Sequence, residues 1–201
     1  MNNPAIQSPR LLARLAQVAV AAAAVAEVGR AVYLHQHRLL SGDDSSGEPR
    51  LTLLLYSYAL MAAIVLFLLW FARCRDNAAA LAPESIKGTG FRAVVCWLIP
   101  VVNLWMPRQL LLELRRASAA ADTAAGRAEA VVNLWWVAWA AHMVLSVALQ
   151  ATGGTSPPLL AAAQVANLAA AALVLWLIEH ITGLQSERVA EAPAAEALSE
   201  P

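Results

Sequence analysis

Long runs of apolar residues alternate with short polar segments along this chain. Four runs are about as long as the roughly 20 residues that a helix needs to cross the hydrocarbon core of a bilayer. They cover residues 15–34, 51–72, 130–149 and 159–178. The polar segments 41–49 and 151–158 contain Gly and Pro, which are typical of loops. The pattern predicts an all-α, polytopic membrane protein with four transmembrane helices, forming a single membrane domain over residues 15–182.

A fifth apolar segment, residues 91–107, has a different character. Pro100 lacks an N–H and breaks or kinks a helix, and Asn103 and Pro107 interrupt the segment again. A fifth crossing would also divide the basic residues that follow between the two sides of the membrane. We therefore expect a Pro-broken re-entrant or interfacial element, with a fifth span as the alternative. Such an element must pack among the spanning helices, because irregular backbone is not tolerated against lipid.

Residues 108–118 have the pattern of a basic, cytoplasmic amphipathic helix. The apolar arc of its helical wheel holds Leu110, Leu111, Leu114 and Ala117, while the polar arc holds Arg108, Gln109, Glu113, Arg115 and Arg116. Leu112 is the one exception to this division. Such a helix can lie in the membrane interface, with Arg108, Arg115 and Arg116 contacting anionic head groups or partners. Alternatively, it docks on the protein's own surface and its arginines are merely solvated.

The distribution of basic residues predicts the orientation, because cytoplasmic loops retain Lys and Arg during insertion. With four spans, 11 of the 14 basic residues lie on one side, and only Arg30, Arg38 and Arg50 lie on the other. Both termini are then cytoplasmic. Residues 1–14 form a cytoplasmic segment, and the acidic, Ala-rich residues 183–201 are expected to be a disordered tail.

The first apolar run has a second interpretation, as a signal peptide cleaved near Ala24–Ala26. Apolar residues resume beyond Glu27, however, and Arg14 intrudes on the run. We expect the helix to be retained.

Composition agrees with a membrane protein and points to no cofactor. Apolar residues make up 60% of the chain and charged residues 14%, against roughly half and a quarter in soluble domains. The formal net charge is zero, so charge indicates no nucleic-acid partner. Cys74 and Cys96 have neither a CxxC spacing nor a flanking His pair, so no metal site is expected. No nucleophile, zincin or nucleotide motif occurs, and we expect a non-enzymatic protein.

The core of the fifth segment, WLIPVVNLWMP, carries a family resemblance. Its fixed positions are Trp97, Pro100, Asn103, Trp105 and Pro107. A basic helix and then the Trp-rich run NLWWVAWAAH follow it. This order resembles the bacterial membrane proteins of domain-of-unknown-function family 4328, over roughly residues 51–182. The resemblance implies a multi-span protein of the plasma (inner) membrane and supplies no catalytic residues.

Polar residues within the spans are costly and are usually functional or paired. In the predicted orientation, Glu27, His142, Gln164 and Asn167 all lie toward the outer half of the membrane. One hypothesis is that they converge on one polar cavity. The alternative is that Glu27 pairs with Arg30 three residues away, while Gln164 and Asn167 only join helices.

The sequence therefore favours a scaffold or sensor module that engages lipids or partner proteins through its basic helix. The alternative function is a small transporter or ligand-binding channel subunit that uses the outer polar residues. The expected partners are the lipid bilayer and either other membrane proteins or further copies of the chain.

Overall fold

The computed structural model describes residues 8–41, 50–81, 93–95, 97, 99, 102–118 and 125–199, without the side chains of residues 38–41, 81, 104, 125 and 189–199. Within these residues all regular structure is helical. The elements are α1 (Arg10–Ser41), α2 (Arg50–Leu81), the 3₁₀ helix η1 (Val102–Leu104), α4 (Met106–Ser118), α5 (Ala125–Ala151) and α6 (Pro157–Ser199).

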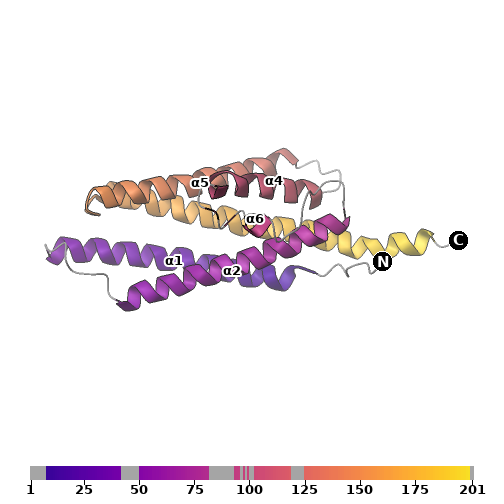
Figure 1. The fold of residues 1–201 in the computed structure, drawn as a ribbon, viewed down its shortest axis with the longest axis horizontal. Helices are drawn as coiled ribbons and strands as arrows, with labels where there is room; N and C mark the ends of the chain where they lie inside the picture. Colours follow the sequence, from indigo (N-terminus) through magenta and orange to yellow (C-terminus); the bar gives the residue numbers. More distant parts are fainter. Residues whose placement is uncertain are drawn as a thin grey trace.

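The four long helices form an elongated bundle made of two pairs (Figure 1). Helix α1 packs against α2, α5 packs against α6, and contacts between α1 and α6 join the pairs. The short helix α4 lies at the end of the bundle where α1 begins and α2 ends, and it contacts α2, α5 and α6. We call this the α4 end, and the opposite end, which holds the turn between α5 and α6, the far end.

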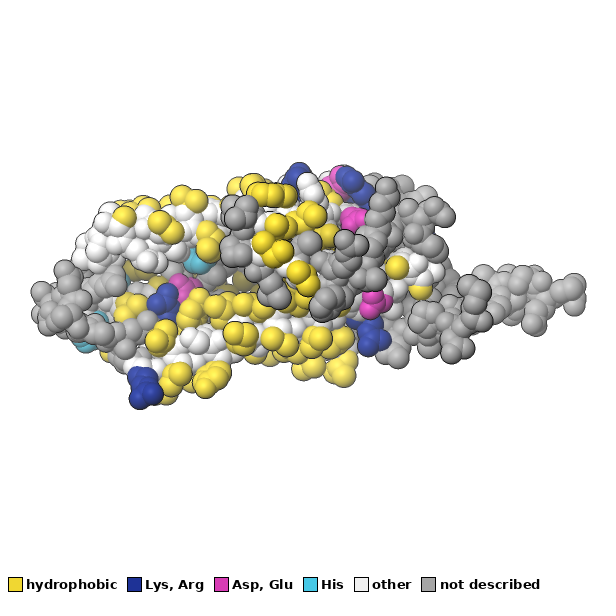
Figure 2. Space-filling model, in the orientation of Figure 1, with side chains coloured by type: hydrophobic (Ala, Val, Ile, Leu, Met, Phe, Trp, Pro, Cys, Tyr) yellow, Lys and Arg dark blue, Asp and Glu magenta, His cyan; other side chains and the backbone are white. Residues whose placement is uncertain are grey.

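The prediction of four long apolar helices is confirmed. Segments Arg10–His37, Arg50–Ala80, Gly126–Ala151 and Pro157–Arg188 are each long and apolar enough to cross a membrane. Many of their large apolar side chains point outward, including Val18, Tyr58 and Val144, and Figure 2 shows apolar surface along the length of the bundle. This surface is accounted for by contact with lipid.

Small residues determine how closely α1 and α2 approach. Ala19 and Ala23 on α1 form a buried cluster with Ala63 on α2. In lipid there is little hydrophobic drive between helices, so close backbone packing over small side chains contributes much of the association. The Ala-rich composition of the first span thus has a packing role.

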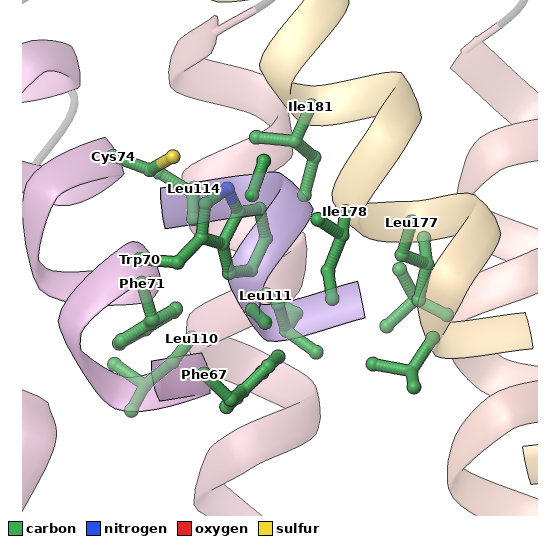
Figure 3. Close-up of a cluster of buried hydrophobic side chains, with 14 of the residues drawn as sticks. Phe67, Trp70, Phe71, Cys74, Leu110, Leu111, Leu114, Leu177, Ile178 and Ile181 are labelled. Atoms are coloured by element: carbon green, nitrogen blue, oxygen red, sulfur yellow. The ribbon is translucent and has the colours of Figure 1, made fainter. Parts of the chain in front are cut away.

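The main hydrophobic core lies at the α4 end (Figure 3). Helix α4 turns its apolar arc inward, and Leu111 and Leu114 are completely buried. They belong to one cluster with Trp70 and Phe71 of α2 and with Ile178 of α6. The apolar arc was predicted from the sequence, and the structure shows that it faces protein and not lipid.

The described residues of the segment 91–107 contain no helix long enough to span a membrane. Ala93 is 5% exposed and belongs to the main core. The Trp97 ring lies 5.0 Å from that of Phe67 and 6.2 Å from that of Trp135, measured between centroids. This part of the segment is therefore lodged between α2 and α5, as packing among the spanning helices requires.

Helix α6 extends beyond the apolar run from which it was predicted. It continues to Ser199, so the structure differs from the sequence interpretation, in which residues 183–201 were a disordered tail. Gln185 is 0% exposed and packs inside the bundle, so the folded domain does not end at residue 182. The Ala, Glu, Leu and Arg residues of this segment are good helix formers, and composition alone does not report the buried partners of Gln185.

Replacing Leu114 by alanine should lower the free energy of unfolding by about 2–5 kcal/mol, because it leaves a cavity where α4 meets α2 and α6. Thermal unfolding of the purified protein in nanodiscs provides the measurement. Leu134→Ala is the matched control, because Leu134 on α5 is 60% exposed and loses little packing. Equal destabilisation by both changes would contradict the assignment of Leu114 to the core.

Candidate functional site

An ion pair with one enclosed partner joins α4 to α2. Arg75 Nη1 lies 2.8 Å from Glu113 Oε2, and the arginine side chain is only 2% exposed, against 31% for the glutamate. An enclosed guanidinium must be neutralised, because removing a charge from water costs several kcal/mol. Glu113 therefore determines where α4 can dock on α2.

A second charged contact joins α4 to α5. Arg115 and Arg116 both reach Glu129 Oε1, at 3.4 and 2.8 Å. The hydrogen bond and charge of Glu129 raise the pKa of Arg116. Arg108 Nε on α4 donates to Asn133 Oδ1 on α5, at 2.7 Å. Each of these three arginines thus has a partner within the protein.

These contacts correct part of the sequence interpretation of Arg108, Arg115 and Arg116 as a surface for lipid or partner contact. The Arg115 side chain is 2% exposed and that of Arg116 is 60% exposed, while Arg108 is half-buried. Arg115 cannot meet a head group without leaving its site. The helix docks on the protein's own surface, as in the second of the two modes considered, but Arg115 is enclosed and not solvated as that mode supposed.

Gln185 on α6 ties three helices together. Its Nε2 donates to the Cys74 carbonyl on α2 at 2.8 Å and to Ser118 Oγ on α4 at 2.9 Å, and its Oε1 accepts from Asn77 Nδ2 at 3.3 Å. Both ends of the amide are therefore satisfied in a fully buried position, which favours one arrangement of the three helices.

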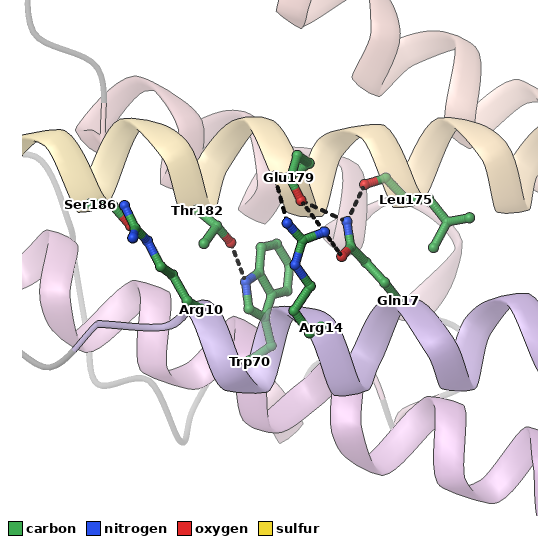
Figure 4. A network of polar contacts seen from close by, with 8 residues as sticks. All are labelled: Arg10, Arg14, Gln17, Trp70, Leu175, Glu179, Thr182 and Ser186. Carbon is green, nitrogen blue, oxygen red and sulfur yellow. Dashed lines mark hydrogen bonds and ion pairs between the residues drawn. The ribbon is translucent and has the colours of Figure 1, made fainter.

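A polar seam joins α1 to α6 near the α4 end (Figure 4). Arg14 and Gln17 both contact Glu179, and Arg10 Nε donates to Ser186 Oγ at 3.2 Å. The Arg14–Glu179 pair is exposed at both side chains and contributes little to stability. In the same region Trp70 Nε1 of α2 donates to Thr182 Oγ1 at 3.0 Å, in buried surroundings.

The residues of the WLIPVVNLWMP motif have different structural roles. Trp97 packs in the aromatic cluster, and Asn103 lies in η1, where its N–H donates to the Ile99 carbonyl at 2.8 Å. Trp105 is 49% exposed. Pro107 lies in the first turn of α4, where proline is tolerated, so it marks the start of that helix. Pro100 lies outside the described residues.

Toward the far end, all four long helices contribute to what we call the polar layer: Glu27 and Arg30 of α1, Tyr56 of α2, His142 of α5, and Gln164 and Asn167 of α6. Asn167 Nδ2 donates to the Ala24 carbonyl at 3.2 Å, which fixes the depth of α6 against α1. Helices α1 and α6 run antiparallel. Gln164, three residues before Asn167, therefore lies level with Glu27, three residues after Ala24.

The other members of the polar layer are joined to this level by direct contacts. His142 Nδ1 lies 3.0 Å from the Ala163 carbonyl oxygen, and Ala163 precedes Gln164. Glu27 forms a two-point ion pair with Arg30 at 2.9 and 3.2 Å, and the Arg30 guanidinium lies over the Tyr56 ring. The four predicted residues thus lie at one depth, with Glu27 paired to Arg30 as in the simpler alternative.

The chemistry of both regions is hydrogen bonding and charge pairing. Among the described residues, no group of three or more His, Cys, Asp or Glu side chains is placed to hold a metal ion. Sequence reasoning missed Glu129, Gln185 and the role of Arg75. In the sequence Arg75 is one of the basic residues that follow the second span, and nothing in its local pattern distinguishes it from Arg73.

Replacing Glu113 by glutamine should lower the free energy of unfolding by about 2–4 kcal/mol, because the enclosed Arg75 guanidinium loses the charge of the carboxylate 2.8 Å from it. Arg14→Gln removes a charge from the exposed pair with Glu179 and should cost less than about 1 kcal/mol. Both can be measured by thermal unfolding in nanodiscs at two salt concentrations. A cost for Glu113→Gln no larger than that for Arg14→Gln would show that the enclosed pair does not hold α4.

Comparison with known proteins gives one match. No curated protein and no solved structure matches the chain. The model of one family covers residues 48–183, which include α2, η1, α4, α5 and most of the spanning part of α6. That stretch holds the aromatic core, the docked helix and the polar residues of α5 and α6. The chain therefore belongs to the family described as Domain of unknown function (DUF4328).

Proposed function

We propose that the protein is a non-enzymatic scaffold or sensor module of the plasma membrane, with the α4 end in the cytoplasm. The observation that carries this proposal is the way α4 is held. It contacts α2, α5 and α6 together. Two ion pairs, each with an arginine side chain that is 2% exposed, join it to α2 and α5, and Gln185 joins it to α6. A displacement of any one of these helices would therefore change the position or exposure of α4.

The outer edge of α4 is the part that a partner can reach. Gln109 and Arg116 are exposed there. A shallow depression of about 400 Å³ is lined by Gln109, Leu112, Glu113, Arg116 and Ala117. The depression presents charged groups next to apolar carbon atoms, as the surfaces of transient protein complexes do. Because the leucine arc is already buried in the protein, we favour a protein partner over lipid head groups.

Site-directed photo-crosslinking tests the partner surface. A photoreactive residue at position 109 should give a defined protein adduct in cells, and Arg116→Glu should reduce that adduct at equal protein abundance. A photoreactive residue at Gln150, exposed at the far end, is the control and should not give the same adduct. Adducts with lipid alone would instead favour the head-group alternative, and no dependence on Arg116 would contradict the proposed surface.

The proposed orientation makes a separate prediction. Reporters that are active only in the cytoplasm should be active when fused to either terminus and inactive when inserted between α1 and α2. The physical reason is the excess of basic residues at the α4 end. An inactive C-terminal reporter would place α4 outside the cytoplasm and remove the basis for a cytoplasmic partner.

A small transporter or ligand-binding channel subunit is the second candidate, and the polar layer favours it. Polar side chains from four helices meet at one depth within the spanning helices, a costly arrangement in a membrane that usually has a function. Solute flux through reconstituted vesicles that depends on His142 and Gln164 would support transport over the scaffold proposal.

A further inference from the structure

The polar layer contains hydrogen-bond acceptors that nothing in the described part of the chain satisfies. Gln164 is 9% exposed, and its Oε1 is enclosed without a donor among the described residues. A buried acceptor left unpaired costs about 1–3 kcal/mol, so native proteins usually supply a donor. Rotating the terminal amide by 180° exchanges Oε1 and Nε2 and can turn the acceptor toward a neighbouring molecule.

His142 supplies a second acceptor at the same depth. The Ala163 carbonyl can only accept, so the histidine nitrogen 3.0 Å from it must carry the proton. In the neutral imidazole Nε2 is then an unprotonated acceptor. Two helices, α5 and α6, thus present acceptors at one level of the bundle.

The charge of the layer limits what can bind there. Both Glu27 oxygens accept from Arg30, and the pair is largely enclosed, with side chains 10% and 24% exposed. Because this pair is neutral as a whole, a further cation or anion would be left without a counter-charge at a depth where isolated charges are costly. Neutral hydrogen-bond donors are therefore favoured over ammonium or carboxylate groups.

The layer is reached from the side. Helix α4 packs between α2 and α5 at the α4 end, whereas α2 and α5 make no extensive contact with each other. Figure 2 shows basic, acidic and histidine side chains close together along the crevice between the two helix pairs, in the half of the molecule away from the C-terminus. The surface on either side of them is apolar, so the crevice presents a polar floor between apolar walls.

We propose that the polar layer is a binding site for a neutral amphipathic alcohol that enters from the bilayer. Its hydroxyl donates to Gln164 and His142, and its hydrocarbon chain lies between α2 and α5. Water could supply the same donor, but water does not use the apolar walls. This site lies far from the outer edge of α4 and goes beyond the scaffold proposal, so either can fail without the other.

A matched pair of probes tests the proposal on the full chain in nanodiscs. The probes are a long-chain alcohol carrying a diazirine in its hydrocarbon chain, and the methyl ether of the same molecule, which cannot donate. The alcohol should label peptides of α2 or α5 about threefold to tenfold more than the ether, which is the effect of one net hydrogen bond. An excess of unlabelled alcohol should suppress this labelling in the unaltered protein.

Gln164→Leu should lower the labelling by the alcohol to the level of the ether, whereas Gln150→Leu, at the exposed far end, should leave it unchanged. His142→Phe provides an independent variant if Gln164→Leu does not fold. Equal labelling by alcohol and ether would overturn the proposal. So would the absence of competable labelling by either probe, which would leave water as the donor.

Discussion

Two arginine side chains at the α4 end, Arg75 and Arg115, are almost completely enclosed, and the arrangement of the bundle depends on neutralising them. Their carboxylate partners, Glu113 and Glu129, lie on different helices. Each pair therefore crosses a helix boundary, and together they hold α4 between α2 and α5. The apolar contacts of α4 bury Leu111 and Leu114 completely, but contacts between leucines tolerate several registers. The charged pairs restrict the helix to one.

The two ends of the bundle solve the same problem of buried polarity in different ways. At the α4 end the amide of Gln185 and the two arginines have partners on neighbouring helices, although Nε of Arg75 and Nε of Arg115 make no hydrogen bond among the described residues. The result is a junction of four helices. In the polar layer Glu27 is paired with Arg30, but Gln164 and His142 present acceptors without donors among the described residues. The first arrangement favours structural specificity, and the second leaves a position for a molecule that is not part of the chain.

Much of the fold could be predicted from the sequence, because the thickness of a bilayer sets the length of each apolar run. The inward arc of α4 could also be predicted from its leucines. Whether that arc faced lipid or protein could not, because both environments accept leucine equally. The partners of Arg75 and Arg115 were hidden for a related reason. Ion pairs such as Arg75–Glu113 join positions 38 residues apart, and hydropathy contains no information about such pairs. The sequence places Gln185 in a disordered tail because local composition contains no information about tertiary contacts.

The length of α6 has a mechanical consequence. Its 43 residues amount to about 65 Å of helix, roughly twice the thickness of the hydrocarbon core. About half of the helix must therefore project from the membrane at the α4 end, where it is visible beyond the other helices in Figure 1. Such a projection acts as a lever arm. A tilt of about 10° within the bilayer would displace its tip by about 5 Å, given the rise of 1.5 Å per residue. A small rearrangement among buried side chains would thus become a displacement large enough for another molecule to detect.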